Sequence, residues 1–201
     1  MNMRPGVRFV FPAWLGRRLG LLAMALGIFA AAPLPAQPGA VKEYHIKALF
    51  LFNFIQFVEW PDDAFSSADA PLVIGVLGDD PFGEVLDEVV RGETIKNRPI
   101  SVKRSHRLSD LAGCQLIFIS RSESRRLEET LRELENRPVL TVGETDRFAH
   151  RGGIIAFYPD GKKVRFEINP STARRVGLKI SSELLGLGKI AAPDSGENGN
   201  R

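Results

Sequence analysis

The sequence has little of what disulfide, metal and nucleophile chemistry require. Its 201 residues include three histidines and one cysteine: His45, His106, His150 and Cys114. A single cysteine excludes an intramolecular disulfide, and no two histidines have the three- or four-residue spacing of a helical metal site. No G-x-S-x-G pattern is present. We therefore expect no metal, no cofactor and no enzymatic activity, and we predict an inert thiol in a buried strand.

A dinucleotide-binding fingerprint is also missing. Gly75, Gly78 and Gly83 accompany an apolar run, but their spacing is not G-x-G-x-x-G. Asp79 and Asp80 lie between them and would repel a pyrophosphate from a helix N-terminus. The pattern instead predicts a turn, with Asp80 and the proline after it opening a helix.

Acidic residues are absent from the first 36 positions, which contain four arginines. Without those arginines, 23 Lys and Arg remain against 24 Asp and Glu, so the rest of the chain is nearly neutral. Nucleic-acid binding needs a basic field to neutralise phosphates, and we expect no nucleic-acid partner. The arginines between 121 and 132 alternate with glutamates, which predicts ion pairs on a helix surface.

The amino-terminal segment has the order of a secretory signal peptide. Arginines precede the uncharged apolar residues 19–32, and small residues surround Ala36. As a helix, the apolar stretch would span only about 21 Å, against about 30 Å for a hydrocarbon core, which disfavours the alternative of a membrane anchor. We predict a signal peptide over 1–36, export to the periplasm, one domain over 37–190 and a disordered tail over 191–201.

The rest of the chain alternates between helical and strand-like patterns. A first helix is expected over 41–58, ended by Trp60 and the following proline. Apolar runs predict buried strands, and a turn signal between two short runs predicts a hairpin. The expected strands are 71–77, 100–103, 115–119, 138–142, and 154–158 paired with 164–168. A closing helix, or a broken helix pair, is expected over 171–187, with Asn169 as its cap and the following proline as its first residue. Together these elements indicate a three-layer α/β domain around a mostly parallel sheet of about six strands.

Two features could serve recognition. In the second half of the first helix, Phe54 and Phe57 belong to an almost continuous apolar surface, which either this domain's core or another protein must cover. In the second hairpin strand, Arg165, Glu167 and Asn169 share one face. That face is either a solvated hairpin surface or a row that recognises a ligand or partner.

Several segments, in chain order, resemble the YfiR family of periplasmic signalling proteins. Together they cover residues 43 to 190, nearly the whole domain. The matching segments are 47–54 (KALFLFNF), 57–61 (FVEWP), 74–83 (IGVLGDDPFG), 152–157 (GGIIAF), 164–169 (VRFEIN) and 178–185 (LKISSELL).

The resemblance implies an exported, non-enzymatic α/β domain that binds the periplasmic part of an inner-membrane diguanylate cyclase, or another membrane sensor, and holds it inactive. The best-known member forms dimers, carries disulfides and is released from its cyclase by an outer-membrane-anchored partner. Disulfides cannot carry over to a chain with Cys114 alone. We expect Trp60 and Arg165 to dominate a partner surface. That surface is predicted to comprise Phe54, Phe57, Trp60, Arg165, Glu167 and Asn169.

The main alternative is a periplasmic receptor for a small molecule. Its pocket would lie at the carboxyl ends of the parallel strands, with the row that begins at Arg165 near it. A periplasmic hydrolase is the third and weakest hypothesis, because no nucleophile and base are recognisable as a pair.

Overall fold

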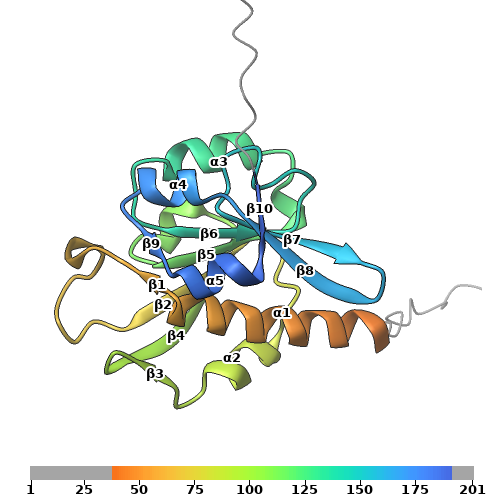
Figure 1. Ribbon diagram of the computed structural model, residues 1–201. Helices are drawn as coiled ribbons and strands as arrows, with labels where there is room; N and C mark the ends of the chain where they lie inside the picture. The colour runs from red at the N-terminus through yellow and green to blue at the C-terminus, as the bar shows by residue number, and fades with distance from the viewer. Residues whose placement is uncertain (1–37, 192–201) are drawn as a thin grey trace, which may run out of the picture. The chain divides into compact units, whose positions relative to one another are not determined.

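The structure is a computed structural model that describes residues 38–191, with side chains from residue 42 (Figure 1). The predicted signal peptide, 1–36, and nearly all of the predicted tail, 192–201, lie outside the described residues. Between residues 38 and 191, no helix combines the length and the apolar character needed to cross a membrane.

An eight-stranded sheet forms the middle layer, in the order β10-β8-β7-β6-β5-β2-β4-β3. Its strands are β2 (Leu72–Leu77), β3 (Thr94–Ile95), β4 (Arg98–Ser105), β5 (Leu116–Ile119), β6 (Leu140–Gly143), β7 (Ile155–Asp160), β8 (Lys163–Ile168) and β10 (Lys189–Ile190). All pairs are parallel except β3 with β4 and β7 with β8. The predicted fold class is confirmed. The two strands beyond the expected six, β3 and β10, have two residues each and are too short for a recognisable pattern.

Helices cover both faces of the sheet. The helices α1 (Pro38–Gln56) and α2 (Glu84–Val90) lie on one face, and α3 (Leu127–Leu134) lies on the other (Figure 1). The short helices α4 (Pro170–Arg175) and α5 (Ser182–Leu187) follow the hairpin. Single 3₁₀ turns, η1 (Asp62–Ala64), η2 (Leu108–Leu111) and η3 (Arg121–Glu123), complete the connections. Each face of the sheet therefore has its own hydrophobic cluster.

The first helix ends two residues earlier than predicted. Its last residue is Gln56, because Val58 and Glu59 form the strand β1 (Val58–Glu59). This strand pairs antiparallel with β9 (Lys179–Ile180), which joins Val58 to Ile180. A pairing 120 residues away in the chain cannot be seen in the local pattern, so the helix end was predicted too late.

The apolar surface of α1 is covered by the domain's own hairpin. Phe54 is fully buried, with its ring centre 5.7 Å from that of Phe157 and 5.0 Å from that of Phe166. Phe50 extends the same aromatic cluster, at 5.4 Å from Phe166. The apolar surface at Phe54 is therefore covered by the core of this domain and not by another protein.

Two of the predicted caps differ in outcome. Asn169 caps α4 as expected, because its side chain accepts a hydrogen bond from the Thr172 N–H at 3.0 Å and proline follows it. Asp80 does not cap α2. Its carboxylate accepts from the Phe82 N–H at 2.8 Å in a local turn, and α2 begins only after Gly83, whose φ is +55°. That prediction was wrong because a left-handed glycine separates the turn from the helix.

Of the two expectations for residues 171–187, the broken helix pair is confirmed. Gly177, with φ of +79°, ends α4, after which β9 leads into α5. The chain then returns as β10, which pairs parallel with β8 and forms one edge of the sheet.

Candidate functional site

The six predicted partner-binding residues do not form one surface. Phe54 and Asn169 are buried. Both sides of the Asn169 amide are occupied, since it caps α4 and donates to the Ala149 carbonyl at 2.8 Å. Neither side chain can contact a partner in this conformation, so the prediction that these two residues belong to a partner surface was wrong.

Phe57 and Trp60 lie at the amino ends of the parallel strands. Both are partly buried against the core. The Trp60 indole donates a hydrogen bond to the Gln115 carbonyl at 3.0 Å, just before β5 begins. Its polar atom therefore holds the chain after α1 against the sheet.

Arg165 and Glu167 lie on the sheet face opposite Phe166, as strand alternation requires. Arg165 is exposed, and its Nε is 3.5 Å from the Asp160 carboxylate. Glu167 is buried, with Oε1 3.7 Å from Nε2 of His150. Phe54 and Arg165 therefore belong to opposite faces of β8, although both were expected in one surface.

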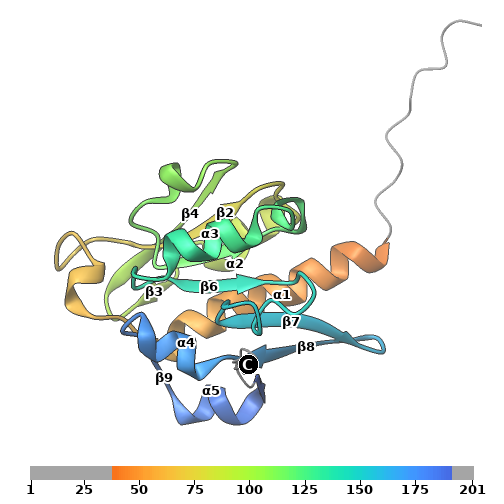
Figure 2. The ribbon, with the colours of Figure 1, turned by 90° about the horizontal axis from the view of Figure 1, so that it is seen from above.

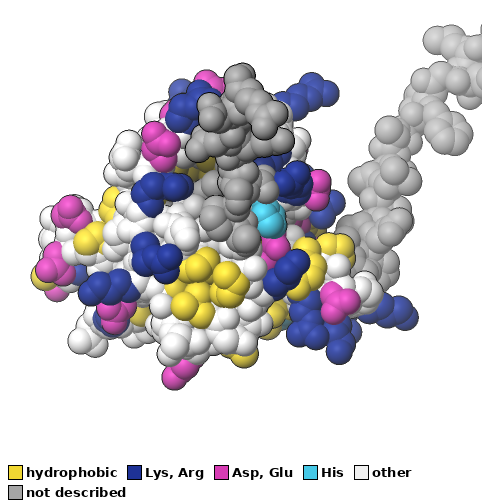
Figure 3. Space-filling model, turned by 45° about the horizontal axis from the view of Figure 1, so that its top comes forward, with side chains coloured by type: hydrophobic (Ala, Val, Ile, Leu, Met, Phe, Trp, Pro, Cys, Tyr) yellow, Lys and Arg dark blue, Asp and Glu magenta, His cyan; other side chains and the backbone are white. Residues whose placement is uncertain are grey.

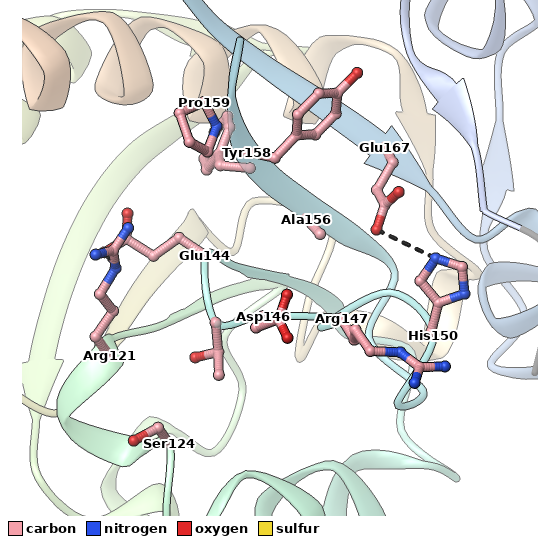
Figure 4. A pocket seen from close by; sticks show the side chains of 12 residues that line it. Arg121, Ser124, Glu144, Asp146, Arg147, His150, Ala156, Tyr158, Pro159 and Glu167 are labelled. Carbon is pink, nitrogen blue, oxygen red and sulfur yellow. Dashed lines mark ion pairs between the residues drawn. The ribbon is translucent and has the colours of Figure 1, made fainter. Parts of the chain in front are cut away.

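A cleft opens where β6 stops and the hairpin continues. The last paired residues are Gly143 and Ala156, while β7 runs on to Asp160. The cleft has a volume of about 610 Å³, and Figure 4 shows Arg121, Asp146, His150 and Glu167 around it. We name it the strand-end cleft. Its lining is Arg121, Ser124, Glu144, Thr145, Asp146, Arg147, His150, Ala156, Phe157, Tyr158, Pro159 and Glu167.

The wall of this cleft depends on a pair of glycines. The fully buried Phe148 ring fills the space beside Gly143 and Gly153, where an added Cβ would lie 2.4 Å and 2.1 Å from ring carbons. The Gly153 N–H donates to the Phe148 carbonyl at 3.0 Å, which folds the loop back on itself. Without side chains at these two positions, the loop after β6 can pack closely over the sheet.

The usual ligand crevice of such a sheet is closed. Strand order reverses between β2 and β5, where ligands of open α/β sheets commonly bind. Here Ser122 Oγ accepts from the Asp79 N–H at 2.9 Å. A Cβ at Gly78 would lie 2.3 Å from that same hydroxyl, so the space is filled. The open cavity of this sheet lies instead at the end of β6.

A buried ion cluster adjoins the strand-end cleft and holds the first half of α1. The Glu144 carboxylate accepts from the Tyr44 hydroxyl at 2.8 Å and from the buried Lys47 ammonium. Lys47 also pairs with Glu43 at 2.5 Å, and Nε of Arg121 lies 3.3 Å from Glu144. Sequence reasoning missed this cluster, because Lys47 and Glu144 are 97 positions apart. It also assigned Arg121 to a helix surface, whereas Arg121 lies in η3 and pairs with Glu144, the residue that follows β6.

Burial shifts the proton affinity of two groups in the domain. Burial, and then the hydrogen bond to the Glu144 carboxylate, raise the pKa of Tyr44 well above its ordinary value, so its hydroxyl remains a donor. Burial raises the pKa of the Cys114 thiol to about 11, which leaves little reactive thiolate at neutral pH.

A second cavity lies between the first half of α1 and the hairpin. Its volume is about 630 Å³, and we name it the hairpin groove. Its lining is Lys42, Glu43, Ile46, Lys47, Arg121, Phe157, Tyr158, Pro159, Gly161, Lys162, Lys163 and Val164. Arg121 borders both cavities, so the ion cluster lies between them.

The sheet edge at β10 carries exposed apolar side chains. Leu187 is 70% exposed and Ile190 is 50% exposed, and Figure 3 shows hydrophobic side chains gathered on the face that α5 forms. Leu49, on α1, is a third exposed large hydrophobic residue of the described chain. Across residues 38–191, no group of three or more His, Cys, Asp or Glu side chains is placed to hold a metal ion.

Comparison with known protein families agrees with this architecture. The family model described as YfiR/HmsC-like matches residues 44–189. That range begins at Tyr44 in the ion cluster and ends at Lys189 in β10, so it includes the aromatic cluster, the whole lining of the strand-end cleft and most of the lining of the hairpin groove. The chain belongs to the YfiR/HmsC-like family.

Proposed function

We propose that this protein represses a membrane-bound diguanylate cyclase by binding the cyclase's periplasmic sensor domain. Members of the YfiR/HmsC-like family are periplasmic regulators of diguanylate cyclase signalling rather than enzymes. The observation that carries the proposal is the family match over residues 44–189. Repression and direct binding to the sensor domain are the specific parts that we add.

The partner surface that the geometry favours is the sheet edge formed by β8, α5 and β10. Leu187 and Ile190 offer apolar area there, and exposed Arg165 on β8 supplies a charge at the rim. Among residues 38–191, β10 is the outermost strand of its sheet and has no strand on its outer side, so a partner strand could pair there. Phe57 and Trp60 would take part only if the partner also reached the amino ends of the strands.

The same edge is available to the other partners that the family resemblance implies, a second copy of the chain and an outer-membrane-associated protein. Competition for one edge would let such a protein release the cyclase without any disulfide, which suits a chain with Cys114 alone.

Gene deletion and complementation test the proposal. Deletion should raise cellular cyclic di-GMP, and the wild-type gene should restore the low level. A Leu187→Glu, Ile190→Glu double variant should fail to restore it, because charges would replace the apolar contact. Leu49→Glu, which changes an exposed leucine elsewhere, is the matched control and should restore repression.

Each variant should be checked for export and for unchanged thermal unfolding. If deletion leaves cyclic di-GMP unchanged, the cyclase assignment is wrong. If the double variant represses as well as wild type, the edge surface is wrong.

A small-molecule receptor is the second candidate, and the strand-end cleft is the observation that favours it. Its volume falls within the range of ligand pockets, and its polar groups converge from several loops. A metabolite that binds there should raise the thermal unfolding temperature of wild type. It should not do so for Glu167→Gln, because Glu167 lines the cleft. An equal rise in both proteins would contradict binding at this cleft.

A further inference from the structure

We propose that the hairpin groove binds a small organic anion with an apolar body, such as an aliphatic or aromatic carboxylate. The groove lies between the first half of α1 and the hairpin, and it is separate from the β10 edge. The inference therefore stands independently of cyclase regulation.

The charge of the groove selects an anion. Its lining includes five basic side chains and one acidic side chain, Glu43. The strand-end cleft differs, because Glu144, Asp146 and Glu167 there balance the basic groups. Figure 3 shows Lys and Arg side chains clustered at the end of the molecule where the hairpin and the start of α1 lie. The excess positive charge is therefore a property of the hairpin groove and is not shared by the strand-end cleft.

Arg121 is the anchor that the ion cluster leaves accessible. The buried Glu144 carboxylate already has two donors, Tyr44 and Lys47, apart from Arg121. The Arg121 side chain is 65% exposed. It can turn its guanidinium to a bound carboxylate without leaving Glu144 unpaired, and a guanidinium binds a carboxylate through two parallel hydrogen bonds.

The hairpin supplies the remaining charge. Lys162 and Lys163 are exposed residues at its tip, and Lys42 lies across from them on α1. None of these three has a carboxylate within ion-pair distance among the described residues that line the groove. Several ammonium groups around one cavity raise the local concentration of an anion and steer it inward.

The floor of the groove requires an apolar body on that anion. Phe157 is buried beneath it, and Ile46 and Val164 are partly buried apolar neighbours from the helix and from the hairpin. A volume of about 630 Å³ is typical of a small-molecule pocket. A ligand that fills it buries apolar surface as well as making ion pairs, so an inorganic anion alone would bind poorly.

Isothermal titration calorimetry with octanoate tests the proposal on the purified protein. Saturable binding is expected for octanoate, and none for acetate, which lacks the body, or for octyltrimethylammonium, which has the opposite charge. Arg121→Gln should weaken octanoate binding roughly tenfold, the effect of losing about one charge-assisted hydrogen bond. A Lys162→Gln, Lys163→Gln double variant should also bind octanoate more weakly than wild type, and this difference should grow as the salt concentration falls. Arg125→Gln is the matched control, because Arg125 is exposed on the same segment but does not line the groove.

Four outcomes would overturn the proposal. These are no saturable binding of octanoate at millimolar concentration, equal binding of octyltrimethylammonium, unchanged affinity in both charge variants, or the same loss in Arg125→Gln. Vesicles of phosphatidylglycerol separate the groove from a membrane surface. If those vesicles bind the protein with the same charge dependence while octanoate does not, the site is a lipid contact and the small-molecule proposal is wrong.

Discussion

The two halves of α1 are attached to the same sheet by different chemistry. The first half is held by the buried cluster of Tyr44, Lys47 and Glu144, and the second half by the packed rings of Phe54, Phe157 and Phe166. Figure 2 shows the helix crossing beneath β6, β7 and β8 between these regions. The apolar attachment contains no ionisable side chain, whereas the polar attachment is formed by charged side chains and a tyrosine hydroxyl.

Both cavities adjoin the polar half. Arg121 lines each of them, and Glu144 and Lys47 line one each. The second half of α1 therefore packs against the hairpin, whereas the first half both stabilises the fold and borders the cavities.

The largest effect is expected at the aromatic attachment. Phe54→Ala should lower the free energy of unfolding by about 3–5 kcal/mol, because it leaves a cavity among three other rings. Denaturant titration measures this change, with Leu49→Ala as an exposed control on the same helix. A loss below about 1 kcal/mol would mean that Phe54 is not a central packing residue.

Removing one partner of the polar attachment should cost nearly as much stability, and removing both partners should restore most of it. Glu144→Leu alone should lower the free energy of unfolding by about 3 kcal/mol, because it leaves the Lys47 ammonium buried with only Glu43 beside it. The double variant Lys47→Met, Glu144→Leu should return to within about 1 kcal/mol of wild type, since no buried charge remains. Additive losses in this double-mutant cycle would contradict coupling between the two groups.

A smaller effect is expected from the tyrosine hydroxyl. Tyr44→Phe should cost about 1 kcal/mol at neutral pH, the net worth of one hydrogen bond. The pKa of Tyr44 is raised in the folded state, so wild type keeps this stability below about pH 10 and loses it as pH rises further. The difference between the two proteins should therefore shrink in alkaline denaturation curves. A difference that grows above pH 10 would reverse the sign and rule out this hydrogen bond as its source.

The smallest effect is expected at Arg121. Arg121→Gln should change the free energy of unfolding by no more than about 0.5 kcal/mol, because the Arg121 side chain is mostly exposed and the buried Glu144 carboxylate keeps Tyr44 and Lys47 as donors. Thermal and denaturant unfolding both measure it. A loss of several kcal/mol would show that Arg121 is part of the structural attachment, and its role as an accessible anchor would fail.

Local pattern was sufficient for much of the fold. The continuous apolar runs of β2, β5 and β6 predicted buried parallel strands, because strands covered on both faces have no polar side. The turn before Lys163 predicted the hairpin, and Asn169 with the proline after it predicted the start of α4. In each case the determining interaction lies within a few residues.

Long-range interactions were not predictable. The ion pair of Lys47 with Glu144 joins residues that have no shared local pattern, so the ion cluster and the hairpin groove beside it could not be predicted. Phe54 was expected at a partner surface because the sequence shows an apolar helix without showing that the hairpin covers it. The strand β10 was not predicted, because it is recognisable as a strand only from its pairing with β8. The candidate site therefore came from the structure, apart from Arg165 and Glu167.

The position of α1 at the start of the described chain has a consequence for how the protein is made. The helix is synthesised before the segments that cover it. Glu144, which binds the Tyr44 hydroxyl, is synthesised 100 residues after Tyr44. Closing a loop of that length costs about 4 kcal/mol of chain entropy, so this polar attachment forms late. During synthesis Phe50 and Phe54 form an uncovered apolar segment, the kind that a chaperone retains. The ion cluster cannot form before Glu144 has been synthesised, and the aromatic cluster cannot form before the hairpin has been synthesised.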